Sequence, residues 1–539
     1  MSDAGEERTA GLGTRVWQAV RLSAGDPVPR AAFKVTLGSL FRLVAGLTRQ
    51  VALAAIFGAG LETDAYLTAY AVPLFLRAVL LSGLPSTLLP AFVRLEADGR
   101  EDDAWELVGT FVWLTGVILT VLAIAGALFS GEIIGLVAPR LSPAKARQAA
   151  RMLVILMFSL PLMGLSNLTR AVENARNRFL RPALATGIGS VANTLTLLLL
   201  YGSVGAPAMA WGFLVSSVLQ AGVTLVPVLA HGWRRLMPLS HPRVREIVRL
   251  MAPIVLFGVL IHAVSLFERY YASGLPDGEL TYLGYATKIS DMIVALLGTG
   301  IATAMFPTMT RVHACRGKPG LVDTTEYGLR LTLAVALPAL AITSAVALPL
   351  LNVLFERGAF GYSDTLSVSR VLPVVMASGL VMAMVGGLLS QAFYVIKDTY
   401  TASILAALAS ALYIPLAGVL VGFRGFVGLG WARLLCSALP VVALTGLLTG
   451  RLGLNLSRVL KHAVGYALAS TVAALGAWMT NNSLGALPAA LKVVGAVAAG
   501  GVIYVAVLWP MDGEAARALL EMTGLRRVVT GARAVFRAD

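Results

Sequence analysis

The chain has 539 residues, of which 57% are hydrophobic and only 13% are charged, and its formal net charge is +15. A soluble chain would carry about twice this density of charge, so the composition indicates a polytopic membrane protein and excludes an ordinary soluble enzyme. The excess of cations does not indicate nucleic-acid binding, because no basic folded face or nucleic-acid motif accompanies it.

Residues 1–33 are polar and carry several arginines, which predicts a cytoplasmic N-terminal tail rather than a cleaved signal peptide. Fourteen apolar segments follow, each of about 20 residues or more and able to cross a bilayer as a helix. The expected fold is therefore an all-α polytopic membrane protein with about 14 transmembrane helices. The segments lie near 34–58, 64–92, 105–130, 148–171, 182–202, 204–230, 247–273, 280–310, 326–351, 366–396, 400–421, 425–449, 459–480 and 486–510.

Basic residues gather in every second connection between these segments, for example in the connection from Arg170 to Arg181. By the positive-inside rule these connections are cytoplasmic, so both termini are expected in the cytoplasm and the number of spans is even. Arg140, Lys145 and Arg357 run against this pattern, because they fall in connections predicted to face the other side.

Two segments of the chain resemble each other. Leu80–Arg94 reads LLSGLPSTLLPAFVR and Leu297–Arg311 reads LGTGIATAMFPTMTR, and they align with an offset of 217 residues. We interpret this as a parallel repeat of two six-helix lobes, with chance likeness between apolar helices as the alternative. Such repeats place a substrate site between the lobes, near the bilayer midplane. The predicted units are an N-lobe at 34–231, a C-lobe at 246–450, two further helices within 459–510 and a basic cytoplasmic tail at 511–539.

Three arginines of the first hairpin, Arg42, Arg49 and Arg77, fall at bilayer depth. A cation there costs about 2.5–3.5 kcal/mol on insertion scales, so intramembrane charge suggests a functional site. Arg42 and Arg49 are about two helical turns apart along one face. Guanidinium groups bind phosphates well, and we expect a cationic wall that binds an anionic cargo. The alternative is structural: each arginine pairs locally or extends to the interface, which suits Arg42 best.

Further charges lie within predicted helices. Asp64 begins the second segment, where it either pairs with Arg49 and gates the cavity or caps the helix. Lys288 either faces the first-lobe arginines across a central cleft, which we favour, or pairs with Asp291 three residues later.

For Glu268, Arg269 and Asp291, pairing with neighbouring side chains is the favoured interpretation. Glu268 is also, like Asp64, a candidate gating residue.

Nothing in the sequence indicates catalysis. It contains no P-loop, no HExxH and no GxSxG motif, and its histidines and its two cysteines, Cys315 and Cys436, are scattered. We therefore predict a transporter with no cofactor and no bound metal, whose energy comes from an ion gradient, the membrane potential or the cargo gradient.

The stretch IFGAGLETDAY (Ile56–Tyr66) resembles the first-hairpin signature of the MurJ/MviN family of lipid II flippases, within the multidrug/oligosaccharidyl-lipid/polysaccharide exporter superfamily. VLFERGAFGYSDT (Val353–Thr365) resembles that family's connection between segments 9 and 10, and the likeness extends from about residue 35 to 510.

The resemblance implies an alternating-access flippase of the bacterial inner membrane. It would move an undecaprenyl-diphosphate-linked peptidoglycan precursor, lipid II, from the inner to the outer leaflet among membrane lipids. The family's cavity cations are matched by Arg49, Arg77 and Lys288, with Arg42 assisting, and its gate aspartate is matched by Asp64.

The chain also departs from the family pattern. Arg42 lies one position early, Ser82 replaces a usual glutamate, and Lys288 replaces an arginine. Segment 11 has no intramembrane acid after Asp398, so the sodium site of some family members has no evident counterpart. Two alternatives therefore stay open: a flippase for another polyprenyl-diphosphate-linked glycan of capsule, exopolysaccharide or O-antigen, and a non-transporting membrane scaffold. Ion coupling and cell-wall synthesis enzymes as partners remain open hypotheses.

Overall fold

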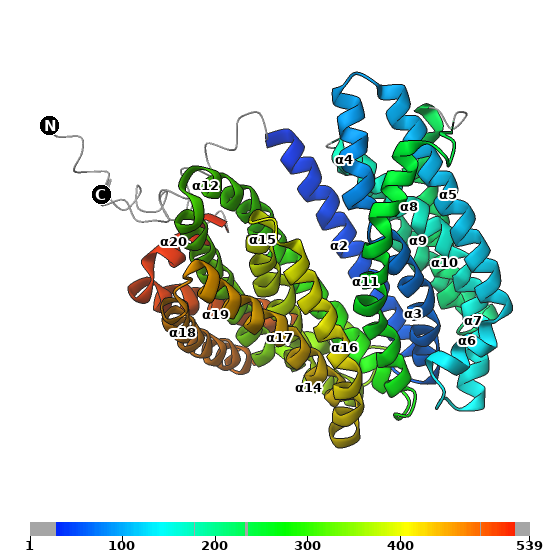
Figure 1. Ribbon diagram of the computed structural model, residues 1–539. Helices are drawn as coiled ribbons and strands as arrows, with labels where there is room; N and C mark the ends of the chain where they lie inside the picture. The colour runs from blue at the N-terminus through cyan, green and yellow to red at the C-terminus, as the bar shows by residue number, and fades with distance from the viewer. Residues whose placement is uncertain (1–28, 177, 232–235, 486, 523–539) are drawn as a thin grey trace.

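The computed structural model describes residues 29–176, 178–231, 236–485 and 487–522. Every regular element in these ranges is a helix (Figure 1), so the predicted all-α membrane fold is confirmed. Most of the predicted N-terminal tail lies outside the described residues, as does the end of the C-terminal tail from 523 onward. Large apolar side chains face outward along the helices, such as Leu199 at 78% exposure and Phe423 at 82%, as expected for contact with lipid.

A first bundle is formed by the helices α2 to α10, which pack mainly on one another. Its members are α2 (Pro29–Phe57), α3 (Leu61–Leu81), α4 (Leu84–Ala97), α5 (Glu101–Leu128), α6 (Ser130–Val137), α7 (Pro143–Met157), α8 (Ser159–Ala175), α9 (Leu180–Val204) and α10 (Ala208–His231).

A second bundle is formed by the next helices along the chain. Its members are α11 (Pro242–Ala272), α12 (Glu279–Ala345), α13 (Ala347–Phe355), α14 (Tyr362–Leu380), the π-helix η1 (Val381–Gly386), α15 (Gly387–Val395), α16 (Thr399–Arg424) and α17 (Phe426–Leu452). Three helices complete the chain: α18 (Leu456–Ser483), α19 (Ala489–Met511) and α20 (Gly513–Met522).

The number of membrane crossings depends on α12. Within the described residues, 12 helices are long and apolar enough to span a bilayer, and the pair α7–α8, bent by 43°, makes a thirteenth span. As a single straight helix, the 67 residues of α12 would reach about 100 Å, far more than a bilayer is thick. Its backbone is non-helical at Gly317, where φ is +64°, so α12 is two helices, 279–316 and 318–345. Counting them separately gives the fourteen crossings expected.

The second expected segment, 64–92, is broken rather than continuous. α3 ends at Leu81 and α4 begins at Leu84, so the break falls at Ser82 and Gly83. Pro85 follows in the first turn of α4, where a missing N–H is tolerated. Gly83 also packs closely on α11, since a Cβ there would lie 3.2 Å from Met251. The break lets α3 and α4 follow α11 of the second bundle.

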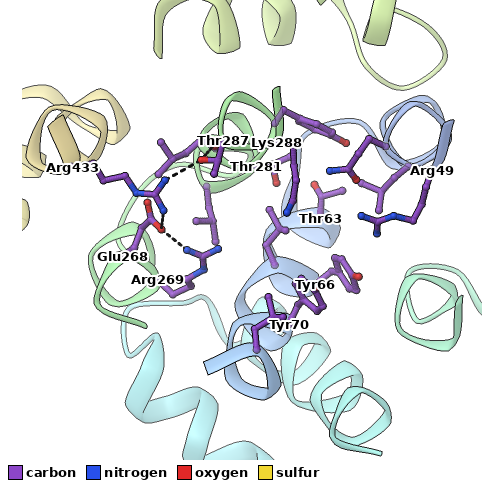
Figure 2. Close-up of a pocket in the computed structure, with 18 residues that line it drawn as sticks. Arg49, Thr63, Tyr66, Tyr70, Glu268, Arg269, Thr281, Thr287, Lys288 and Arg433 are labelled. Atoms are coloured by element: carbon purple, nitrogen blue, oxygen red, sulfur yellow. Dashed lines mark hydrogen bonds and ion pairs between the residues drawn. The ribbon is translucent and has the colours of Figure 1, made fainter. Parts of the chain in front are cut away.

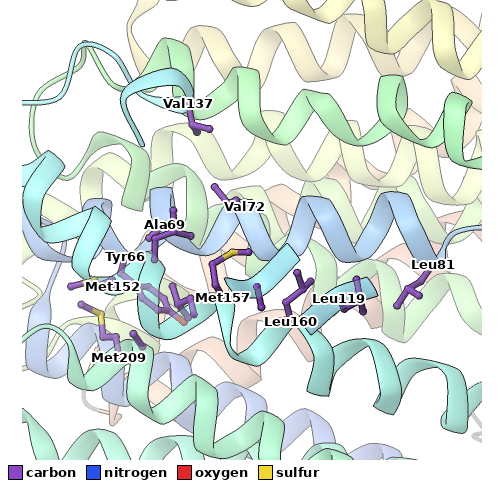
Figure 3. Packing of buried hydrophobic residues seen from close by; sticks show 14 of the residues in the cluster. Tyr66, Ala69, Val72, Leu81, Leu119, Val137, Met152, Met157, Leu160 and Met209 are labelled. Atoms are coloured by element: carbon purple, nitrogen blue, oxygen red, sulfur yellow. The ribbon is translucent and has the colours of Figure 1, made fainter. Parts of the chain in front are cut away.

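The core of the first bundle is built around α3. Its side chains Tyr66, Ala69 and Val72 are at most 6% exposed and pack in one apolar cluster with residues of α5, α7, α8 and α10, such as Met152 and Met209 (Figure 3). α3 also packs against α11 and α12 of the second bundle. One face of α3 is thus fixed in its own bundle, while another reaches the contact between the bundles.

The last helices pack on the second bundle through α12. α18 and α19 share an apolar cluster with Ala334 and Ile342 of α12. The Tyr504 hydroxyl of α19 donates to the Ala334 carbonyl at 2.8 Å. Figure 1 shows α18, α19 and α20 at the side of the second bundle away from the first, so they do not separate the two bundles.

Candidate functional site

A cavity of about 120 Å³, here called the central cavity, lies between the two bundles. α2 and α3 line it from the first bundle, and α11, α12 and α17 line it from the second (Figure 2). Its charged lining residues are Arg49, Glu268, Arg269, Lys288 and Arg433. Four cations thus share the wall with one carboxylate, which leaves a formal charge of +3 among the lining residues.

On the second-bundle side, Glu268 joins two arginines. Its side chain is 1% exposed, and its Oε2 accepts from Nη1 of Arg269 at 2.5 Å and from Nη2 of Arg433 at 2.9 Å. Arg433 also donates from Nη1 to the Thr287 hydroxyl at 3.1 Å. The expected pairing of Glu268 with Arg269 is confirmed. Arg433, which the sequence analysis did not single out, is its second partner.

Arg49 and Lys288 belong to the same cavity but make no ion pair with a carboxylate of the described residues. Arg49 lies beside the Tyr66 ring on the first-bundle side (Figure 2). The Lys288 side chain is exposed within the structure and interacts electrostatically with Asp291, Arg49 and the second-bundle arginines. The alternative of a Lys288–Asp291 ion pair is therefore not realised, and both cations are free to face a ligand.

Arg42 and Arg77 do not line the central cavity. They form a second cationic group with Arg170 of α8, which interacts electrostatically with both. We call these three residues the arginine trio. The Nε atoms of Arg77 and Arg170 are buried without a hydrogen-bond partner among the described residues. Tyr70 lines the central cavity and interacts electrostatically with Arg49 and with Arg77, so the trio lies toward the Tyr70 side of this cavity.

The position of Arg170 differs from the one predicted, which was in a basic connection. It lies inside α8 (Ser159–Ala175), more than one turn before the helix ends. The four predicted cargo-binding cations are therefore divided between two places in the structure, with Arg49 and Lys288 in one and Arg42 and Arg77 in the other.

At the distal end of the bundles, where α2 ends and α3 begins, Asp64 connects the two bundles. It is 1% exposed, and its Oδ2 accepts from the Lys145 ammonium and from the Gly278 backbone N–H, both at 2.8 Å. Its Oδ1 accepts from the backbone N–H of Thr281 at 2.9 Å and from the hydroxyl at 2.6 Å. The alternative in which Asp64 pairs with Arg49 was wrong, because the Asp64 carboxylate pairs with Lys145 instead.

Asp64 is not the cap of its own helix either. The first turn of α3 is closed by Thr63, whose hydroxyl accepts from the Gly60 backbone N–H at 2.9 Å. The Asp64 carboxylate instead accepts at the start of α12, where the N–H groups of a first turn lack partners within their own helix. It therefore joins α3 of the first bundle to α12 of the second.

Lys145 explains one exception to the charge pattern of the connections. Only 4% of this residue is exposed, and its ammonium also contacts the Asp277 carboxylate at 3.0 Å. A lysine that is buried between two carboxylates is paired and carries little topological information.

Two more contacts close the distal end. The Ala359 backbone N–H donates to the Ala55 carbonyl at 2.8 Å, and the backbone N–H of Arg140 donates to the Ser273 hydroxyl at 3.3 Å. Gly358 has a φ of +61°, and a Cβ on it would lie 2.1 Å from the Ala55 carbonyl oxygen. The bundles are thus in direct backbone contact at this end.

Comparison with known proteins identifies the family. A family model described as lipid II flippase MurJ matches residues 53–490, which is most of the chain. The chain belongs to the lipid II flippase MurJ family. Its members are membrane transporters rather than enzymes, as the sequence analysis predicted for this chain.

Relatives from several bacteria support the family assignment. A probable lipid II flippase MurJ of Bdellovibrio bacteriovorus is 28% identical over 456 residues, which cover 82% of this chain and 86% of that protein. A lipid II flippase MurJ of Burkholderia cenocepacia is 27% identical over 410 residues, which cover 72% of this chain and 79% of that protein.

Solved structures show the same fold. A lipid II flippase MurJ in an inward closed conformation superposes with a TM-score of 0.74 at 20% identity, covering 88% of this chain and 98% of that one. An inward-facing multidrug resistance MATE family transporter of the MOP superfamily has a TM-score of 0.65 at 15% identity, covering 83% of this chain and 98% of that one. The chain therefore shares its fold with a MurJ flippase and with a MATE transporter.

Three residues of this MurJ-family site were missed or misplaced from sequence. Arg433 lies inside the apolar segment 425–449, where the argument applied to Arg42 would have found it. Arg170 was assigned to a connection, and Lys145 was noted only as an exception to the charge pattern. The partners of Arg433 and Lys145 become visible only once the fold brings distant segments together.

Proposed function

We propose that this MurJ-family chain moves lipid II from the inner to the outer leaflet of the bacterial inner membrane by alternating access. The observation that carries the proposal is the cation-rich central cavity between two bundles of a lipid II flippase family fold. The cargo is anionic at its diphosphate, and a wall with four cations and one carboxylate favours an anion.

In this proposal the diphosphate binds between Arg49 on the first bundle and Lys288 on the second. Arg77 and Arg42 receive it on the way to the cavity. Moving a charged group through a bilayer is costly unless it stays hydrated or paired. Two groups of cations at different positions keep the diphosphate paired along its path, while the apolar tail remains in lipid.

Asp64 is proposed as the gating residue of the outer side. It holds the bundles together at the distal end through Gly278 and Thr281, while Lys145 of the first bundle contacts Asp277 of the second, and outward opening requires these contacts to separate. The proposal takes both termini to be cytoplasmic and the distal end to face outward. It takes the two bundles to be the lobes that move, at 34–231 and 246–450.

Complementation tests the proposal. The chain is expressed in a bacterium depleted of its own lipid II flippase, and growth is measured together with the amount of the protein in the membrane. The native chain should restore growth, whereas Arg49→Ala and Arg77→Ala should fail at unchanged membrane level. Lys288→Arg should still support growth, because it keeps the charge and adds a planar fork of donors.

Arg94→Ala serves as the matched control, because this exposed arginine lies on α4 and belongs neither to the lining of the central cavity nor to the arginine trio. Failure of the native chain to restore growth would reject lipid II as the cargo. Normal growth of both Arg49→Ala and Arg77→Ala would reject the roles given to these arginines.

A further inference from the structure

The ion pairs of Glu268 leave hydrogen-bonding atoms without partners on both the carboxylate and an arginine. Its Oε1 is buried and has no hydrogen-bond partner among the described residues, and the same holds for Nε of Arg269. Only Oε2 is engaged, and it is shared between the two arginines. A buried acceptor and a buried donor without partners are costly in a finished structural ion pair.

The surroundings of this ion-pair group are cationic. Arg269 and Arg433 line the central cavity together with Arg49 and Lys288, and Glu268 is the single carboxylate among the described lining residues (Figure 2). Each guanidinium has five N–H donors, of which a single carboxylate oxygen can accept few. A ligand with several anionic oxygens would satisfy more of these donors than Glu268 does.

We propose that Arg269 and Arg433 complete the diphosphate site from the second bundle, and that Glu268 is an internal counter-anion. Glu268 holds both arginines while the cavity is empty and releases them to the diphosphate when cargo enters. The inference rests on the proposed function, because it takes the cargo to be a polyprenyl diphosphate.

An exchangeable carboxylate has a physical use in transport. Two unpaired arginines in a low-dielectric cavity would repel each other, and they would bind a diphosphate too tightly to let it go. Glu268 keeps them oriented and paired between cycles, and it competes with the cargo at the release step. Arg269 and Arg433 then exchange the Glu268 carboxylate for the diphosphate, and neither arginine is left unpaired.

The binding of inorganic pyrophosphate to the purified full chain in lipid nanodiscs tests this directly, by isothermal titration calorimetry. Glu268→Gln removes the competing charge at nearly the same size, and it should tighten pyrophosphate binding severalfold. Arg433→Gln should weaken it by about tenfold, because hydrogen bonds to charged groups are lost. The two substitutions should therefore shift the dissociation constant in opposite directions.

Asp291→Asn is the matched control. Asp291 lines a neighbouring cavity of about 280 Å³ and interacts with Lys288 and Arg433 only at a distance. Its substitution removes the same charge without freeing a hydrogen-bonded guanidinium, so its effect on pyrophosphate binding should be the smaller one.

If Glu268 has only a structural role, Glu268→Gln will weaken binding as Arg433→Gln does, or neither will change it, and either result overturns the inference. The native chain failing to bind pyrophosphate overturns it as well. Arg433→Lys, which keeps one charge but not the two-sided contact, should bind with intermediate affinity and covers the case in which Arg433→Gln does not fold. Complementation tests the proposed function separately. Lipid II transport can fail while the dissociation constants of Glu268→Gln and Arg433→Gln for pyrophosphate still shift in opposite directions.

Discussion

Thr281 donates both its backbone N–H and its hydroxyl to Oδ1 of Asp64, and the two residues are separated by 217 positions. This separation equals the offset at which Leu80–Arg94 aligns with Leu297–Arg311. If the interpretation of a repeat is extended to these helix starts, Asp64 and Thr281 are counterparts in its two copies. Counterparts touch each other only near the axis that relates two copies, which agrees with a contact between α3 of the first bundle and α12 of the second.

Asp64→Asn should loosen the distal end. The substitution weakens the hydrogen bonds that Asp64 accepts from Gly278 and Thr281 of the second bundle. It also removes the charge that pairs with Lys145, and breaking one partner of a buried ion pair costs about 3–5 kcal/mol. We expect the distance between spin labels on Glu62 and Tyr362, both exposed at this end, to lengthen and broaden. Asp102→Asn, an exposed acid elsewhere, should leave the distribution unchanged. An unchanged distribution in Asp64→Asn would show that Asp64 does not hold the distal end closed.

Lys145 and Asp64 should be energetically coupled. Lys145→Met leaves Asp64 and Asp277 without their shared cation, so it should lower the thermal midpoint strongly. The double variant Asp64→Asn/Lys145→Met removes both buried charges, and it should be less destabilised than the sum of the single variants by about 1–3 kcal/mol. The measurement is a double-mutant cycle of unfolding in detergent. Simple additivity would mean that the ion pair contributes nothing beyond its two separate side chains.

Much of the fold could be predicted, because a bilayer permits few solutions. The length of the apolar segments was enough to predict the helices, and the fourteen expected segments correspond to helices or to parts of them. The break at Ser82 and Gly83 was not predicted, since a glycine and a nearby proline are common inside membrane helices. The turn at Gly317 was expected as a connection, but the helical hydrogen bonding on both sides merges it into one long element.

The sequence predicted that intramembrane charges form the site, but it did not predict which residues pair with each other. Intramembrane charge located Arg49 and Lys288 in a shared cavity, because charge is costly in lipid wherever it occurs along the chain. The partner of Asp64 was not predictable, since Lys145 lies 81 residues away on a helix whose neighbours the sequence does not give. The same holds for Arg433, which is 165 residues from Glu268.

Gly358→Ala should disrupt the contact between the bundles. A methyl group there would lie 2.1 Å from the Ala55 carbonyl oxygen, and the positive φ of Gly358 disfavours any other residue. We expect a lower thermal midpoint and the same broadened distal distance as in Asp64→Asn. Gly361→Ala is the control in the same connection, because no atom lies within 4 Å of its Cβ position and its φ is −95°. Equal effects of both glycine substitutions would argue against a specific contact.

The attachment of α20 should depend on pH. Asp512, between α19 and α20, accepts from the Tyr466 hydroxyl at 2.5 Å and from Arg330 at 2.6 Å. Burial by itself raises the pKa of Asp512, but the hydrogen bonds from Tyr466, Arg330 and the Ala515 N–H outweigh it, so the pKa lies below its ordinary value of 3.8. The stabilisation is fully present above the unfolded-state pKa and is lost as the pH falls through the folded-state pKa.

The thermal midpoint of the native chain should therefore fall as the pH decreases below about 4. Asp512→Asn should have a lower midpoint at neutral pH, and a smaller further loss on acidification. Asp102→Asn again serves as the control, because its exposed carboxylate has no such partners among the residues that the structure describes. A parallel acid response in the native chain and Asp512→Asn would assign the loss to other carboxylates.

Arg170→Ala should impair transport as strongly as Arg77→Ala while the protein remains in the membrane. Arg42, Arg77 and Arg170 come from three different helices, and none forms an ion pair with a carboxylate of the described residues. Three cations that repel one another are retained at a cost in stability, and we propose that they are kept together to bind an anion. Arg170→Ala should therefore raise the thermal midpoint or leave it unchanged, while growth in the complementation assay is lost. A lowered midpoint with normal growth would make Arg170 a structural residue, with Arg94→Ala showing the effect of removing an exposed arginine.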